Sequence, residues 1–338
     1  MMNTQGKATV LLIGGVVLLA VATAVMALLS MDPQGKSGSG LSKEFSYDLE
    51  RLKQTDPALI LYEETDSPIH TNLAQPIALA IGPEDVIYVA GDRLVRTFSS
   101  SGELGTLEIN LEGQPRCLAV AKDGTVYVGV TDHVEIYSTE GRLVKRWESA
   151  GPDALLVSIA VAEDTVYVAD FSKKEVLRYD RSGRPMEPMG DFVIPSPYFD
   201  VALAPDGLVH VTNTGEHRIE AYTPDGNLQS FWGTFSNTDA ECFSGCCNPI
   251  NIALLPEGQG FITTEKGLTR VKVYDGEGAF KGFVAGAESF TQHDSLCDAP
   301  DYNLTRVGLD VAVDSTGRVL VLDPATAELR IFVSRAAR

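Results

Sequence analysis

Beyond residue 59, short apolar segments alternate with polar turns containing Gly or Asp, and this pattern recurs about every 40 residues. Each repeat starts with a short apolar segment, and a second segment rich in Val, Ile and Tyr follows after a turn. The six pairs are Ile77–Ile81 with Val86–Ala90, Cys117–Val120 with Thr125–Gly129, Ser158–Val161 with Thr165–Asp170, Asp200–Leu203 with Leu208–Thr212, Asn251–Leu254 with Gly260–Thr264, and Asp310–Val313 with Arg318–Asp323. Because no helical period intervenes between them, these segments predict antiparallel strands.

A third segment in every repeat ends at or near an aromatic residue. These residues are Phe98, Tyr137, Tyr179, Tyr222, Tyr274 and Phe332. In the first five repeats a Gly-containing turn follows, and a fourth strand is expected to run outward from it. Four short strands per repeat are typical of a β-propeller blade, so the chain predicts an all-β fold.

The sixth repeat ends after its third strand, and another part of the chain can complete it. Leu59–Glu63 precedes the first blade and belongs to no other repeat, so it would supply the missing outer strand. Joining both ends of the domain in one blade removes a free sheet edge, which is otherwise a site of aggregation. This count predicts six blades rather than five or seven.

The repeats share the pattern Pro-x-x-x-Ala-Val, Asp-Gly-x-Val-Tyr-Val-Ala-Asp and Arg-Ile-x-x-Tyr-x-x-Asp-Gly, which resembles the NHL repeat over residues 59–338. Arg218 and Arg270 match the arginine of that family's blades. The other blades depart from it at Leu94, His133, Glu175 and Glu328. The family includes peptide-amidating lyases, binding scaffolds and many uncharacterised secreted proteins. The resemblance therefore implies a six-bladed β-propeller but no particular activity.

The one long apolar run, Ala8–Ser30, contains no charged residue and is long enough to cross a bilayer as a helix. Ala22-Thr23-Ala24 offers a signal-peptidase site, but it lies inside the run, so we favour an uncleaved signal anchor. One lysine precedes the run and two follow it, which leaves its orientation open. The short N-terminal head and the cysteines favour a single-pass membrane protein with its propeller in the periplasm or the extracellular space.

These patterns divide the chain into four parts. Residues after the apolar run are rich in Gly, Ser and Pro, and Phe45, Leu49 and Leu52 recur at helical spacing before Pro57. The predicted parts are a cytoplasmic head (1–7), a transmembrane helix (8–30), a linker with a short amphipathic helix (31–58), and the propeller (59–338), with strand 59–63 closing the last blade.

Charge excludes some classes of partner. The chain carries 46 acidic and 27 basic residues and a formal net charge of -19 at pH 7. Nucleic acid is bound through clustered Lys and Arg, and anionic lipid attracts basic segments, so neither is expected to bind the propeller. A cationic protein partner would suit this surface, although most surface acid serves solubility.

Four of the five cysteines fall in the two longest insertions, as Cys242-Phe-Ser-Gly-Cys246-Cys247 and Cys297. Both insertions join an outer strand to the next inner strand, so they should emerge at one mouth of the propeller, above blades 4 to 6. Outside the cytoplasm four such thiols are expected to form two disulfides. Adjacent cysteines rarely bond each other, so Cys246 and Cys247 are each expected to pair with Cys242 or Cys297, and which pairs form stays open. The alternative is a four-thiolate metal or iron–sulfur site. Cys117 is expected to be a buried thiol.

A second candidate site lies at the start of the inner strands, where Asp200, Asn251 and Asp310 come from three successive blades. These oxygens would suit Ca²⁺, which takes six to eight oxygen ligands. The arrangement is similar to the calcium site of six-bladed lactonases and paraoxonase-type hydrolases. In that resemblance the opposite side adds a carboxylate, where this chain has Ala78 and Cys117. The structural alternative is that Asp and Asn bond backbone amides of neighbouring blades.

A third set of polar residues follows the second strand of the blades. The set comprises Asp92, Asp170, Asn213, Glu265 and Asp323. Asp170 and Asp323 occupy the usual polar position of the repeat, which favours a structural role. Glu265-Lys266 departs from that usage and shares a blade with the Cys246-Cys247 insertion, so we regard this pair as a candidate binding site at the mouth.

The five histidines are scattered, and the chain has no Gly-x-Ser-x-Gly elbow, phosphate loop or dinucleotide motif. We therefore predict no catalytic residue, no certain cofactor, and a non-enzymatic role. The expected function is a membrane-tethered scaffold, or an accessory subunit of a membrane complex such as a respiratory or photosynthetic one, that binds a membrane-associated protein. The alternatives are a calcium-dependent hydrolase or lyase at the channel, and a cysteine-ligated redox or metal protein.

Overall fold

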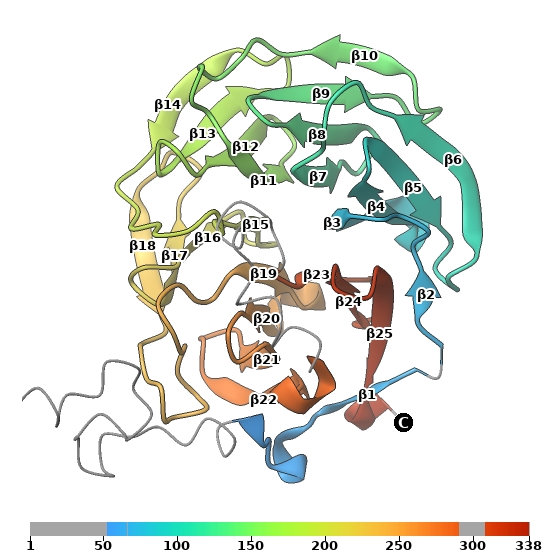
Figure 1. Cartoon of the computed structure of the whole chain (residues 1–338). Helices are drawn as coiled ribbons and strands as arrows, with labels where there is room; N and C mark the ends of the chain where they lie inside the picture. Colours follow the sequence, from blue (N-terminus) through green and yellow to red (C-terminus); the bar gives the residue numbers. More distant parts are fainter. Residues whose placement is uncertain (1–52, 66, 291–307, 338) are drawn as a thin grey trace, which may run out of the picture. The chain divides into compact units, whose positions relative to one another are not determined.

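The computed structural model describes residues 53–65, 67–290 and 308–337. Their strands form six antiparallel sheets arranged as a ring, and each sheet is one blade (Figure 1). The inner strands of successive blades are neighbours around the ring, and the inner strand of the last blade contacts that of the first. The predicted six-bladed β-propeller is therefore confirmed.

Blades 1 to 3 each contain four strands in the order in which the chain makes them. Their strands are β3 (Pro76–Ile81), β4 (Ile87–Gly91), β5 (Leu94–Phe98) and β6 (Leu104–Asn110); β7 (Cys117–Val120), β8 (Val126–Val130), β9 (His133–Tyr137) and β10 (Leu143–Arg146); and β11 (Leu156–Val161), β12 (Thr165–Asp170), β13 (Glu175–Asp180) and β14 (Pro185–Met189). A short 3-10 helix, η3 (Pro83–Asp85), forms the first inner turn.

Blades 4 and 5 repeat this order, and blade 6 combines the two ends of the domain. Their strands are β15 (Val201–Leu203), β16 (Val209–Asn213), β17 (Arg218–Tyr222) and β18 (Leu228–Trp232); β19 (Asn251–Leu254), β20 (Gly260–Glu265), β21 (Arg270–Asp275) and β22 (Phe280–Ala285); and β23 (Asp310–Val313), β24 (Val319–Asp323) and β25 (Glu328–Ser334), with β1 (Tyr62–Glu64) and β2 (Ile69–His70). Three further 3-10 turns are η2 (Pro57–Leu59), η4 (Pro256–Gly258) and η6 (Arg335–Ala337).

The N-terminal segment closes blade 6 as predicted, but its strand begins later. β1 pairs antiparallel with β25, and β2 pairs with the other end of the same strand. The segment before β1 forms η2 instead, because Pro57 starts a 3-10 turn whose amide at Ala58 is capped by the Asp56 carboxylate. The predicted strand 59–63 is therefore displaced to residues 62–64.

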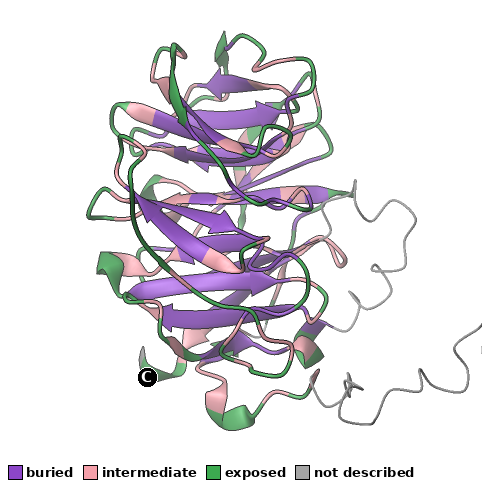
Figure 2. Ribbon diagram, turned by 90° about the vertical axis from the view of Figure 1, so that its left-hand side faces the viewer, coloured by how far each residue is buried: buried purple, intermediate pink, exposed green. Residues whose placement is uncertain are grey.

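Apolar side chains from adjacent sheets pack against each other, so the core is divided among the interfaces between blades. Second strands such as β8 and β16 are buried along their whole length, whereas the outer strand β10 is exposed throughout (Figure 2). The Gly turn after the third strand meets the preceding blade. A Cβ at Gly278, whose φ is +82°, would lie 2.2 Å from Trp232 of blade 4, which explains the predicted turn glycine.

The predicted transmembrane helix (8–30) and most of the linker lie outside the described residues. Among the residues that the structure describes, no helix is long and apolar enough to span a membrane. Cys297 and most of its insertion also lie outside the described part of the chain.

Candidate functional site

The channel at the centre of the ring holds a cavity of about 120 Å³. It is lined by the first residues of the inner strands, among them Ala78, Cys117, Ser158, Asp200 and Asp310. The structure thus brings together most of the predicted ring of inner-strand residues. Cys117 is a buried thiol with 3% of its surface exposed.

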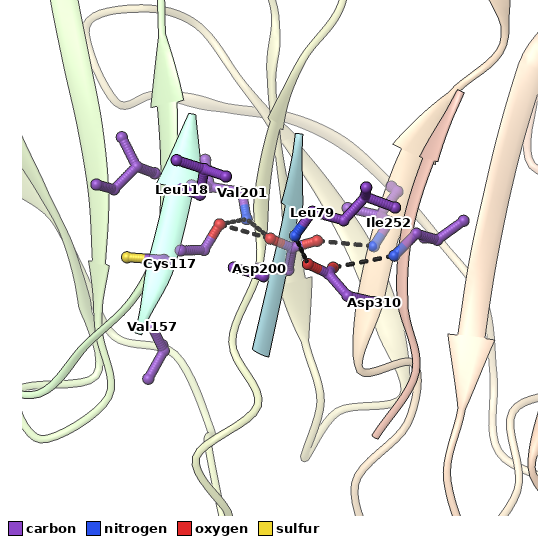
Figure 3. A pocket seen from close by; sticks show the side chains of 12 residues that line it. Leu79, Cys117, Leu118, Val157, Asp200, Val201, Ile252 and Asp310 are labelled. Carbon is purple, nitrogen blue, oxygen red and sulfur yellow. Dashed lines mark hydrogen bonds between the residues drawn. The ribbon is translucent and has the colours of Figure 1, made fainter. Parts of the chain in front are cut away.

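Both carboxylates of the channel accept hydrogen bonds from neighbouring blades (Figure 3). The Oδ2 atom of Asp200 accepts from the Ile252 amide of blade 5 at 2.8 Å, and its Oδ1 atom accepts from the Ser158 hydroxyl of blade 3 at 2.5 Å. Asp310 likewise accepts from the Leu79 amide of blade 1 at 2.7 Å. These hydrogen bonds connect neighbouring blades, which is the structural alternative given for these residues in the sequence analysis.

The third predicted calcium ligand also has a structural partner. The side-chain amide of Asn251 donates to the carbonyl oxygen of Leu309 at 2.6 Å. Among the described residues, no group of three or more His, Cys, Asp or Glu side chains is placed to hold a metal ion. Calcium in the channel would therefore have to recruit backbone oxygens or water beside Asp200 and Asp310, and the calcium site stays a prediction.

The polar residues after the second strands cap the loop that enters their own blade. Asp92 accepts from the Gln75 amide at 2.9 Å, Asp170 from the Leu155 amide at 3.1 Å, and Asn213 from the Val193 amide at 3.0 Å. Asp323 accepts instead from the Ala325 amide within its own turn, at 2.9 Å. These contacts stabilise the mouth of the propeller.

In blade 5 this position is Glu265, and it anchors the loop 234–250, which we call the thiol loop. The Glu265 carboxylate is fully buried and accepts from the Ser244 amide through Oε1 at 3.0 Å. Its Oε2 atom lies 2.6 Å from a guanidinium nitrogen of Arg270 and 3.2 Å from Nζ of Lys272. One buried carboxylate therefore pairs with two buried cations, and we call these three residues the charge cluster.

The two cations of the charge cluster also bind the thiol loop directly. Lys272 Nζ donates to the Cys242 carbonyl oxygen at 2.6 Å, and Arg270 donates to the Ser244 hydroxyl at 3.1 Å. Burial lowers the pKa of Lys272 to about 8, although Glu265 opposes this shift. A buried charge is costly unless it is paired and hydrogen-bonded, so the loop carbonyl helps to keep the lysine charged.

The other half of the predicted pair, Lys266, lies at the two adjacent cysteines of the thiol loop. Its Nζ atom is 3.1 Å from the Ser196 hydroxyl and 4.5 Å from the centre of the Tyr198 ring. Its main chain is held by the side chain of Asn248, which accepts from the Lys266 amide and donates to its carbonyl oxygen. The sulfurs of Cys246 and Cys247 are 3.2 Å apart.

The surroundings of the two sulfurs differ. Cys246 is exposed, whereas Cys247 is 1% exposed. Burial alone would raise the pKa of the Cys247 thiol, but hydrogen bonds and charge from Ser196 and Lys266 hold that pKa below its ordinary value. Burial and the neighbouring sulfur raise the pKa of Cys246. The pair therefore combines an accessible thiol with a buried thiol that ionises more readily than an ordinary cysteine.

The structure does not decide the predicted disulfides. Cys242, Cys246 and Cys247 form no disulfide with any other described residue, and Cys297 lies outside the described part. Burial and the nearby Asp239 raise the pKa of the Cys242 thiol. The two predicted disulfides and the alternative four-thiolate site both stay predictions.

Sequence reasoning missed Ser196, Tyr198 and Lys272 as parts of this site. Ser196 and Tyr198 lie in the connection from β14 to β15, which is also an outer-to-inner connection and so reaches the same mouth. That topology was available from the repeat and could have identified this segment. Lys272 lies within the third strand, where nothing in the strand's own pattern marks it as buried.

The fold and these sites define a six-bladed β-propeller, and comparison with solved structures agrees. A streptogramin B lyase matches with a TM-score of 0.57 and 10% sequence identity, over 83% of this chain and 100% of that chain. A gluconolactonase from Xanthomonas campestris gives 0.58 and 15%, over 83% and 93%. The Kuenenia stuttgartiensis hydrazine synthase gives 0.53 and 14%, over 81% and 99%. No family model and no curated protein matches the sequence. At these identities the likeness shows the fold alone.

Proposed function

We propose that this chain is a protein-binding propeller that recognises its partner with the mouth above blades 4 and 5. The observation that carries this proposal is an exposed aromatic side chain on an anchored loop. Phe235 of the thiol loop is 52% exposed. Phe243 of the same loop is fully buried, and its main chain pairs with that of Phe235 in an isolated β-bridge. A large aromatic side chain held on a rigid support is typical of the centre of a protein interface.

The surface around Phe235 supports the same role. Its ring lies 4.9 Å from the ring of His217, and the Arg218 guanidinium lies 4.6 Å from the ring of Phe231, which is 57% exposed. We call Phe231 and Phe235, with His217 and Arg218, the aromatic patch. Tyr, Phe and Arg side chains are enriched at interfaces because they bury large areas while keeping polar contacts. The acidic net charge of the chain suits a partner with a basic surface.

We further infer that the blades are of the NHL type and that the segment 8–30 tethers them to a membrane. The repeat pattern and the charge-free apolar run support this assignment. The propeller would then act as an accessory subunit, in the periplasm or the extracellular space, of a membrane complex.

Site-specific photo-crosslinking tests this function. A benzophenone side chain replaces Phe235 in the full chain, and a matched chain carries it at Leu104, which is 61% exposed on β6 of blade 1. After irradiation of native membranes, we expect one discrete adduct from position 235 and none from position 104. The same adduct from both positions, or none from either, would overturn the proposal.

A second candidate, a calcium-dependent hydrolase or lyase, is favoured by the cavity that Asp200, Asp310 and Ser158 line. Elemental analysis of the purified chain tests it. One calcium per chain that is lost in Asp310→Asn would support this alternative. Absence of stoichiometric calcium in the purified chain would exclude it.

A further inference from the structure

The pair of adjacent cysteines has a geometry that the proposed binding role does not use. The sulfurs of Cys246 and Cys247 are 3.2 Å apart, one exposed and the other buried. A disulfide bond is about 2.05 Å long, so the two sulfurs must approach by about 1 Å. The Cα atoms of adjacent residues are only about 3.8 Å apart, which is closer than in ordinary disulfides, so the bond would be strained and readily reduced. Reagents from solution can reach Cys246, which is exposed, whereas Cys247 is buried beside it.

The residues beside Cys247 are those that a reactive thiolate needs. The ammonium group of Lys266 and the hydroxyl group of Ser196 both interact with the Cys247 sulfur, and they also bond each other at 3.1 Å. Asn248 fixes the main chain of Lys266, and Glu265 fixes that of Ser244 just before the pair. Thiolates stabilised by a nearby cation are the reactive form of cysteine in exchange reactions.

Cys242 lies in a different environment although it belongs to the same loop. Its carbonyl oxygen is held by Lys272, while Asp239 beside its thiol disfavours the thiolate. Within the thiol loop, the surroundings that favour a thiolate are therefore those of Cys247, and Cys246 is its exposed neighbour.

We propose that Cys246 and Cys247 form a redox-active dithiol that is oxidised by low-molecular-weight disulfides. In the first step, the Cys246 sulfur, as thiolate, attacks one sulfur of the small disulfide and expels the other as a thiolate. The Cys247 thiolate then attacks the Cys246 sulfur, forms the bond between the two cysteines and expels the second small thiolate. Two small thiols are produced for each disulfide consumed, and the reverse sequence reduces the pair.

Peptide mapping of the purified full-length chain after treatment with glutathione disulfide tests this proposal. Chymotryptic cleavage after Phe243 separates Cys242 from the pair, so a bond between Cys246 and Cys247 stays within one peptide. We expect that peptide to become resistant to alkylation and to regain both thiols with dithiothreitol. The Cys242→Ser and Cys297→Ser chains should behave as the parent chain does.

Variants of the pair and of its lysine separate the two steps. Cys247→Ser should accumulate a mixed disulfide on Cys246, because no second thiolate is present to release it. Lys266→Gln should slow the release step on the order of tenfold, and Lys266→Arg should restore most of the rate. A disulfide that links either cysteine to Cys242 or Cys297 would overturn the proposal, as would a Cys247→Ser chain that forms no mixed disulfide.

Discussion

Blades 4 and 5 each place a buried carboxylate beside an equivalent arginine, but the carboxylate occupies a different strand in each blade. Asn213 pairs in register with Arg218 in blade 4, as Glu265 does with Arg270 in blade 5. Two residues further along the third strand, blade 4 has Glu220 and blade 5 has Lys272. The carboxylate has therefore moved from the third strand to the end of the second.

This difference in position changes which part of the chain each cluster binds. In blade 4 the Glu220 carboxylate accepts from Asn213, Arg218 and Tyr222, so its bonds stay within one sheet. In blade 5, Lys272 reaches the Cys242 carbonyl oxygen and the hydroxyl of Tyr274 donates to the Glu241 carbonyl oxygen at 3.2 Å. The same kind of buried cluster thus stabilises a blade in one case and anchors an insertion in the other.

The largest effect is expected when the carboxylate of the charge cluster is removed. Glu265→Gln leaves Arg270 and Lys272 buried without a counter-charge, which should lower the free energy of unfolding by about 3–5 kcal/mol. Glu220→Gln in blade 4 is the matched control and should cost less, because the side chain of Arg218 is 28% exposed and water can solvate it. Urea denaturation of both chains measures the difference, and equal losses would refute the contrast between the blades.

Removing the lysine should affect the thiol loop more than the whole fold. Lys272→Met keeps the pair of Glu265 and Arg270 but leaves the Cys242 carbonyl oxygen without its donor, at a cost of about 1–2 kcal/mol. Amide hydrogen exchange should accelerate in residues 234–250 and stay unchanged in blade 2. Uniform acceleration across all blades would contradict a local anchor.

The pH dependence of stability should reveal the buried lysine. Its pKa is about 8 in the folded chain, below the ordinary value of 10.5, so the unfolded chain binds more protons between these values. The contribution of Lys272 to the free energy of unfolding should therefore rise as the pH rises from about 8 toward 10.5. Urea denaturation of the parent chain and Lys272→Met at several pH values isolates this contribution, since other groups titrate alike in both. A flat or falling difference would contradict the low pKa.

The smallest effect on stability is expected at the exposed end of the same loop. Phe235→Ser should change the free energy of unfolding by less than about 0.5 kcal/mol, because its side chain is half exposed. It should nevertheless abolish retention of the partner by the detergent-solubilised chain. Leu104→Ser is the control for loss of an exposed apolar side chain and should keep the partner.

The repeat pattern was sufficient to predict the blades, because short apolar strands recur about every 40 residues and are separated by polar turns that contain Gly or Asp. It also singled out Glu265-Lys266, because blades 3, 4 and 6 have Asp or Asn at the position of Glu265. The pattern could not show that Lys272 is buried beside Glu265, because that depends on the insertion folding back over blade 5. At the channel, composition alone could not distinguish a metal site from a structural role. Asp200 and Asp310 are residues that suit a metal ion, and in the structure both accept hydrogen bonds from backbone amides of neighbouring blades.

The closure of blade 6 has a mechanical consequence. β1 and β2 both pair with β25, and the Arg330 guanidinium holds the Glu64 carboxylate through two bonds of 2.7 and 2.6 Å. Just before β1 the chain also contacts blade 5, where the Leu61 amide donates to the Phe283 carbonyl oxygen at 2.9 Å. Tension applied on the N-terminal side of the propeller would therefore load this contact first and the pairing of β1 with β25 next. These contacts with blades 5 and 6 therefore set how much tension the closed ring withstands before it opens.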